Sequence, residues 1–248
     1  MNVSCARVLT TACVVMLLAV ASPIFGSAVS HVSGSGPMVA TNAYGSHLGP
    51  DPLIYFQSPD FNGAWASQND TNGLGQYATA FDNFRVGASY NITTFAFVGS
   101  YFNPGQQGMM TGATLAFFAD AGGVPGALLW VGSGTGNLGE TFLGMDNLGD
   151  PTYLYFAALG TPFLAEANTI YWVSIVPDVG FPPQWGWETA TGGDSAAYQC
   201  FFGTCSSIPN DLAFGFFGNP ATTPEPSALP LLGSGLLGVA GTLCRKRS

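Results

Sequence analysis

The chain has 248 residues, of which 47% are hydrophobic and only 8% are charged, and its formal net charge is −9. Four of its five cations lie near the ends, so the acidic stretch from Asp51 to Asp211 carries one basic residue, Arg85. Such a stretch should repel phosphate backbones, which argues against nucleic acid as a partner. Solubility outside the cell explains this acidity, and cation binding in acidic loops is the alternative.

Residues 1–28 predict a signal peptide. Arg7 and the α-amine precede an apolar stretch, Val8–Val20, which is too short to span a bilayer comfortably. The small residues Gly26-Ser27-Ala28 favour cleavage after Ala28. An uncleaved anchor is the alternative. A lipoprotein signal fits less well, because Cys13 lies inside the apolar stretch.

Residues 29–52 are rich in Ser, Gly and Pro and show little periodicity, so they predict a flexible lead-in. The chain's two histidines, His31 and His47, both fall there. A nucleophilic triad needs a base beside its Ser or Cys, so we do not expect a His-based triad in the rest of the chain.

Residues 53–222 consist of short apolar runs separated by Gly, Pro, Asn and Asp. This pattern predicts an all-β fold, a single β-sandwich or jelly-roll-like domain. The runs are Tyr77–Val86, Ile92–Gly99, Ala113–Ala119, Ala127–Gly132, Thr152–Leu159, Thr169–Val176, Trp185–Glu188, Ala196–Phe202 and Leu212–Phe217.

Several acidic loops of this domain have two interpretations. Asp120 precedes a Gly-Gly and Pro-Gly turn, where its carboxylate would cap the turn or bind a cation. The loops 70–73 and 146–150 offer clustered oxygens that suit calcium. Neither loop completes an EF-hand pattern, and Asx turns explain both.

Glycoside hydrolysis needs two carboxylates at a suitable separation, and Glu140, Glu166 and Glu188 are the candidates. Nothing in the sequence brings two of them together. Trp185 and Trp187 are candidates for glycan binding, because two rings spaced by one residue share a strand face. The alternative is that both rings fill the core, where aromatic side chains mostly lie.

Cys200 and Cys205 are the two cysteines outside the terminal segments. In an oxidising compartment they predict a short disulfide loop. Free thiols or a metal site are the alternatives, and two cysteines alone cannot complete a structural zinc site.

Residues 223–248 have three parts in a fixed order. Pro224-Glu225-Pro226 comes first, and each proline favours extended backbone before it. An uncharged stretch from Ser227 to Cys244 follows, which as a helix would span about 27 Å, the short end of membrane-spanning lengths. The basic Arg245-Lys246-Arg247 ends the tail and should stay cytoplasmic by the positive-inside rule.

This tail resembles the PEP-CTERM sorting signal. The resemblance implies a transient inner-membrane anchor and processing by an exosortase, a transpeptidase-like membrane enzyme of Gram-negative bacteria that make exopolysaccharide. The turn at 117–129, together with the run 169–175, is similar to β-sandwich domains on surface-anchored bacterial proteins. An ordinary C-terminal anchor after a proline linker is the alternative for the tail.

The sequence therefore predicts an exported, non-enzymatic protein of the cell surface or extracellular matrix, without cofactor or metal. Its expected partners are an exosortase-like enzyme, the membrane and exopolysaccharide, all three implied by the tail. The alternative is a carbohydrate-binding module or a glycan-active enzyme that uses the region of Trp185 and Trp187.

Overall fold

The computed structural model describes residues 34–40 and 51–222, and the regular secondary structure of these residues consists of strands. Two sheets of seven strands each pack face to face, which confirms the predicted all-β sandwich. The predicted signal helix and membrane helix lie outside the described residues. Among the residues described, no helix is long and apolar enough to cross a membrane.

The first sheet, sheet A, is built around β10, which pairs with β4 on one side and β6 on the other. From β4 the sheet continues through β12 to the edge strand β13, and from β6 it continues to β7. Its strands are β3 (Gln68–Asp70), β4 (Gly75–Arg85), β6 (Met110–Asp120), β7 (Pro125–Thr135), β10 (Ile170–Val179), β12 (Ala197–Phe201) and β13 (Thr204–Ile208).

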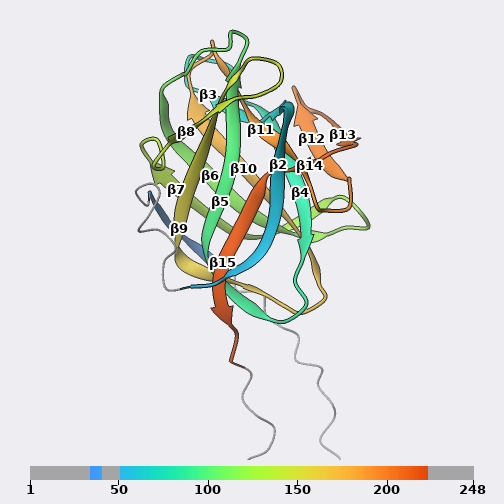
Figure 1. The fold of residues 1–248 in the computed structure, drawn as a ribbon. Coiled ribbons are helices and arrows are strands. Elements are labelled where there is room, and N and C mark those ends of the chain that lie inside the picture. Colours follow the sequence, from blue (N-terminus) through green and yellow to red (C-terminus); the bar gives the residue numbers. More distant parts are fainter. Residues whose placement is uncertain (1–33, 41–50, 223–248) are drawn as a thin grey trace, which may run out of the picture. The chain divides into compact units, whose positions relative to one another are not determined.

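The second sheet, sheet B, forms the near layer of the view in Figure 1. Two strands, β15 and β11, lie end to end between β5 and β2, and each pairs with both neighbours. Its strands are β2 (Leu53–Ala66), β5 (Tyr90–Phe102), β8 (Thr141–Met145), β9 (Pro151–Ala165), β11 (Gln184–Thr191), β14 (Asp211–Leu212) and β15 (Phe214–Pro220).

A strand at the start of the described chain joins the two sheets. β1 (Gly34–Ala40) pairs in parallel with β7 of sheet A and antiparallel with β9 of sheet B. This strand falls inside the range for which the sequence predicts a flexible lead-in. The strand forms in a sequence that is rich in Gly and Ser and carries no strand periodicity.

The core between the sheets is largely aromatic and includes seven phenylalanines, Phe84, Phe95, Phe97, Phe117, Phe163, Phe214 and Phe216. Rings from the two sheets meet directly: Phe117 of β6 stacks on Phe163 of β9, with ring centroids 4.2 Å apart. Phe84 of β4 contacts Phe216 of β15 at 4.6 Å. These contacts follow from the strand period of two, because alternate residues of each strand point to the same face.

Gly99 of β5 shows how closely this core is packed. A Cβ atom at Gly99 would lie 2.0 Å from Cζ2 of Trp185 and 2.8 Å from the backbone oxygen of Gly186. The indole ring therefore occupies the space that a side chain at position 99 would need. Glycine is required here for close approach rather than for its backbone freedom.

Candidate functional site

The residues of the predicted sorting signal, Pro224, Glu225, Pro226, Arg245, Lys246 and Arg247, lie outside the described residues. The candidate sites discussed below therefore belong to the sandwich itself.

Trp185 and Trp187 share the inner face of β11, as their spacing predicts, and both have no exposed surface. The indole Nε1 of Trp185 donates to the hydroxyl of Tyr155 at 3.1 Å, and that of Trp187 donates to the backbone oxygen of Ala213 at 2.9 Å. Both rings are satisfied inside the core, so neither presents a face on which a sugar could stack. Their burial favours the core interpretation over glycan binding.

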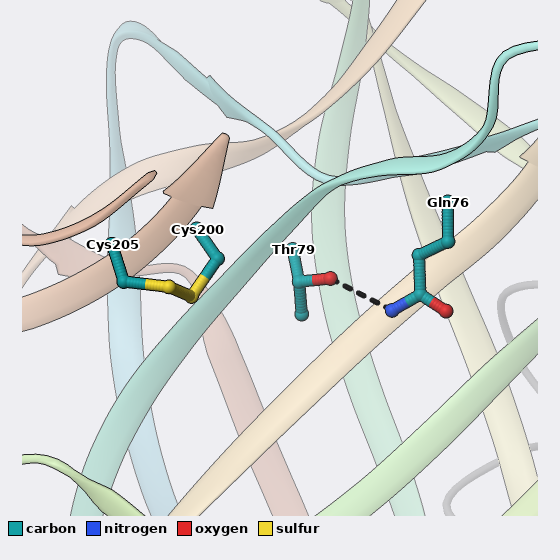
Figure 2. The surroundings of a disulfide bond; sticks show 4 residues. All are labelled: Gln76, Thr79, Cys200 and Cys205. Carbon is teal, nitrogen blue, oxygen red and sulfur yellow. Dashed lines mark hydrogen bonds between the residues drawn. A yellow bond between two sulfur atoms is a disulfide. The ribbon is translucent and has the colours of Figure 1, made fainter. Parts of the chain in front are cut away.

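The predicted disulfide between Cys200 and Cys205 is confirmed. It joins β12 to β13 at directly paired positions and lies beside β4, where Cys200 is in register with Thr79 (Figure 2). On β4 the side-chain amide of Gln76 donates to the Thr79 hydroxyl at 2.8 Å. The disulfide thus closes the hairpin at the outer edge of sheet A.

The tip of this hairpin carries an exposed aromatic cluster, which we define as Phe201, Phe202 and Tyr77. Phe202 is 61% exposed and Phe201 is 39% exposed, whereas Tyr77 is buried beneath them. The ring centroids of Phe201 and Phe202 are 4.9 Å apart, and that of Tyr77 lies 5.2 Å from Phe202.

The turn that displays these rings has an unusual backbone. Phe202 and Gly203 both have positive φ, 47° and 80°, the pattern of a two-residue hairpin turn in which Asn or Gly is preferred at the first position. A bulky residue with φ above zero is strained and is held there by its surroundings. The backbone N–H of Phe202 donates to the oxygen of Tyr77 at 2.7 Å, which ties the tip to β4.

Sequence reasoning did not identify the aromatic cluster as a site. The available signal was the Phe-Phe-Gly sequence between two cysteines, because a disulfide hairpin puts its central residues at a turn. Tyr77 could not have been added, since its place beneath the tip depends on the pairing of β12 with β4.

The aspartates of the acidic loops mostly accept hydrogen bonds from backbone N–H groups. Asp120 accepts from Gly122 and Gly123 and also from the indole of Trp172. These bonds, that from Trp172 above all, lower the pKa of Asp120. They are the bonds expected of a turn cap, the first of the two interpretations of this residue.

The loop of Asp70 is organised in the same way. Its carboxylate accepts from the N–H groups of Phe181, Asn72 and Leu74, which lowers the pKa of Asp70 against the opposing effect of burial. Asp146 accepts through Oδ1 from Leu148 and Asp150, so an Asx turn forms there too. Backbone amides thus serve as partners for these carboxylates, in a described part of the chain whose one basic side chain is Arg85.

The three candidate glutamates have separate surroundings. Glu140 accepts from the hydroxyls of Tyr101 and Tyr155 at 2.6 and 2.8 Å. Glu166 lies in the turn before β10, where its backbone N–H donates to the hydroxyl of Tyr171. Glu188 is fully buried and accepts from the N–H of Gly63 at 3.2 Å. The structure does not assemble them into a catalytic pair.

Within residues 34–40 and 51–222, no three His, Cys, Asp or Glu side chains form a group that could hold a metal ion. The chain matches no protein-family model and no curated protein sequence.

Proposed function

We propose that this protein is an exported bacterial surface protein that an exosortase-like enzyme processes at its C-terminal tail. Its body is a non-enzymatic part of the extracellular matrix. The observation that carries the proposal is the order of the tail: Pro224-Glu225-Pro226, then an uncharged stretch of membrane-spanning length, then Arg245-Lys246-Arg247.

Two features of the sandwich support this proposal. The Cys200–Cys205 disulfide suits an oxidising compartment, although it indicates one only weakly. The carboxylates of Asp70, Asp120 and Asp146 hold turns together through backbone amides, which are structural rather than catalytic tasks.

The test is to express the full chain in a Gram-negative host that makes exopolysaccharide and has an exosortase, and to determine the C-terminus of the surface protein by mass spectrometry. We expect a mature chain that ends near Glu225 and lacks Arg245–Ser248. The double variant Pro224→Ala/Pro226→Ala should stay full-length in the inner membrane, whereas Pro209→Ala, an exposed proline of the body, should be processed normally. An intact chain found soluble in the cytosol, or a processed double variant, would refute the proposal.

A second candidate function is binding of extracellular glycans at the aromatic cluster of the β12–β13 hairpin. Exposed rings stack on sugar rings through their faces, and the exposed polar residue Thr204 is paired directly with Phe201 across the hairpin. The specific observation is the display of Phe202 on a disulfide-closed turn with positive φ.

A glycan array on the full chain tests this second function. We expect retention on acidic or neutral exopolysaccharide to fall about tenfold for Phe202→Ser, the loss of roughly 1.4 kcal/mol. Phe142→Ser is the matched control, because Phe142 is also exposed but lies on β8 of the other sheet. Equal retention by both variants would exclude the hairpin as the binding surface.

A further inference from the structure

The outer edge of sheet A is the free side of β13. This strand pairs with β12 on one side (Figure 1), and no other strand that the structure describes pairs with it. Four of its five residues, from Thr204 to Ser207, are exposed. The free side therefore presents backbone N–H and C=O groups to the surroundings, and a further strand can pair with such an edge.

The register of the hairpin decides which backbone groups point outward. Phe201 and Thr204 flank a two-residue turn, so they form a hydrogen-bonded pair, and such pairs recur at every second position of an antiparallel ladder. Ser206 therefore also bonds to β12. The N–H and C=O groups of Cys205 and Ser207 point the other way, to the free edge.

A hydrogen bond on the far side of β12 agrees with this alternation. The N–H of Phe202, the residue after β12, donates to the backbone oxygen of Tyr77 in β4 at 2.7 Å. Because successive N–H groups of a strand point to opposite sides, that of Phe201 points to β13. Two independent contacts thus assign the same outward-facing groups.

β13 lacks the devices by which edge strands usually avoid pairing with another chain. These devices are charged side chains, a proline inside the strand, a bulge, or a loop that covers the edge. The strand reads Thr-Cys-Ser-Ser-Ile, and its pairing with β12 continues without a shift of register. The Cys200–Cys205 disulfide also links the two strands, which keeps the edge in the extended form that pairing requires.

The distribution of charge favours a second copy of this chain as the partner. The segment 195–209, which contains the whole hairpin, has no charged residue, although the formal net charge of the chain is −9. Two such copies repel each other least where both present an uncharged surface. In an antiparallel pair, the base of each hairpin, which lies between Asp194 and Asp211 in sequence, faces the uncharged tip of the other.

We propose that two copies of this protein associate by antiparallel pairing of β13 with β13, about a two-fold axis at Ser206. In this register Cys205 of each copy pairs with Ser207 of the other, so every outward-facing residue of the two strands is used. A register shifted one way would involve Pro209, which has no N–H, and one shifted the other way would involve Gly203 of the turn. Sheet A then continues from one copy into the other.

The exposed aromatic cluster lies at the end of this contact. Phe202 of each copy comes beside the segment that follows β13 of the other copy, where its exposed ring adds apolar contact to the backbone hydrogen bonds. A five-residue edge is nevertheless a small interface, so the association is weak and reversible.

Sedimentation velocity of the full chain in detergent tests the pairing, and the natural chain should show a dimer that increases with concentration. Ser207→Pro removes an outward N–H but no bond to β12, so its dimerisation should be at least about tenfold weaker. Ser207→Ala, the matched control, keeps the N–H and should behave like the natural chain. All three chains have the same tail, so association through the tail would not distinguish them.

Cross-linking tests the register without a proline variant. In the proposed pair, Ser206 lies opposite Ser206 of the other copy at a Cα separation of about 4.5 Å, within reach of a disulfide. Ser206→Cys should therefore form a covalent dimer on mild oxidation, in a chain whose Cys5, Cys13 and Cys244 are replaced by serine. Thr204→Cys, an exposed control on the same strand, should cross-link at least about tenfold less, because its two copies lie roughly 13 Å apart along the strands.

Three results would each overturn the proposal. They are a natural chain that stays monomeric at about 1 mM, a Ser207→Pro variant that dimerises like the natural chain, and a Thr204→Cys variant that cross-links as readily as Ser206→Cys.

Discussion

Replacing Trp187 by alanine distinguishes a core indole from a ligand-binding one. The ring is fully buried and contacts Phe95 and Phe214 at centroid distances of 6.0 and 5.7 Å. Removing a buried aromatic ring costs about 3–5 kcal/mol through lost transfer energy and the remaining cavity. In a domain of this size that lowers the melting temperature by about 6–20 °C.

Trp187→Phe separates the ring from its hydrogen bond. The backbone oxygen of Ala213 also accepts from the N–H of Val98 at 3.0 Å, so it keeps a partner when the indole is gone. The loss should then be about 1–2 kcal/mol, the net value of one hydrogen bond plus a small cavity.

Urea and thermal unfolding, followed by circular dichroism, measure both variants. Phe202→Ala is the control, because an exposed ring should change stability by about 0.5 kcal/mol or less. The argument fails if Trp187→Ala is as stable as the natural chain, or if Phe202→Ala is the more damaging of the two.

The remaining predictions concern two interactions of sheet A: the Cys200–Cys205 disulfide and the hydrogen bond from the indole of Trp172 to Asp120. Cys200→Ser/Cys205→Ser should lose about 2 kcal/mol, as expected for a loop that joins cysteines five positions apart. Thermal unfolding should show this loss, and a reducing agent should lower the melting temperature of the natural chain but not of the variant. Asp120→Ala should lose about 1–3 kcal/mol, because the buried indole N–H of Trp172 loses its acceptor. The pKa of Asp120 is lowered from 3.8, so its contribution is complete above that value and is lost as the pH falls through the folded value. The difference in urea midpoint between Asp120→Ala and the natural chain should therefore narrow in acid, and a constant difference would contradict this assignment.

The strand pattern of the sandwich was predictable where apolar residues form an uninterrupted run. The run 113–119 lies inside β6, and the run 152–159 lies inside β9. The sequence pattern did not predict β2 as a strand, because Pro59 and Gly63 interrupt the alternation of apolar residues. The pairing of β2 with β11 also shifts register between Glu188 and Ala190. β13 is mostly polar and exposed, so no apolar pattern predicts it. Its sequence signal was Cys205, through the disulfide predicted with Cys200 of β12.

The candidate sites were less predictable because they depend on contacts between distant strands. The spacing of Trp185 and Trp187 indicates one shared face but not whether that face meets solvent or the opposite sheet. Glu188 has the same difficulty, since the N–H group from which its carboxylate accepts belongs to Gly63, 125 positions earlier in the chain. Periodicity describes one strand at a time and contains no information about what lies over it.

The end-to-end arrangement of β11 and β15 in sheet B also sets the order in which this chain can fold. Among the strands that the structure describes, β2 pairs with β11 and β15, so it has no such partner until β11, which begins at Gln184, has been synthesised. Leu53 pairs with Phe217, three positions before β15 ends at Pro220. Pairing between distant strands slows folding, because the entropy cost of closing a long loop comes before the stabilising contacts can form. The first long strand of the sandwich therefore remains unpaired while most of the chain emerges, and sheet B closes only when the segment just before Pro224 is present.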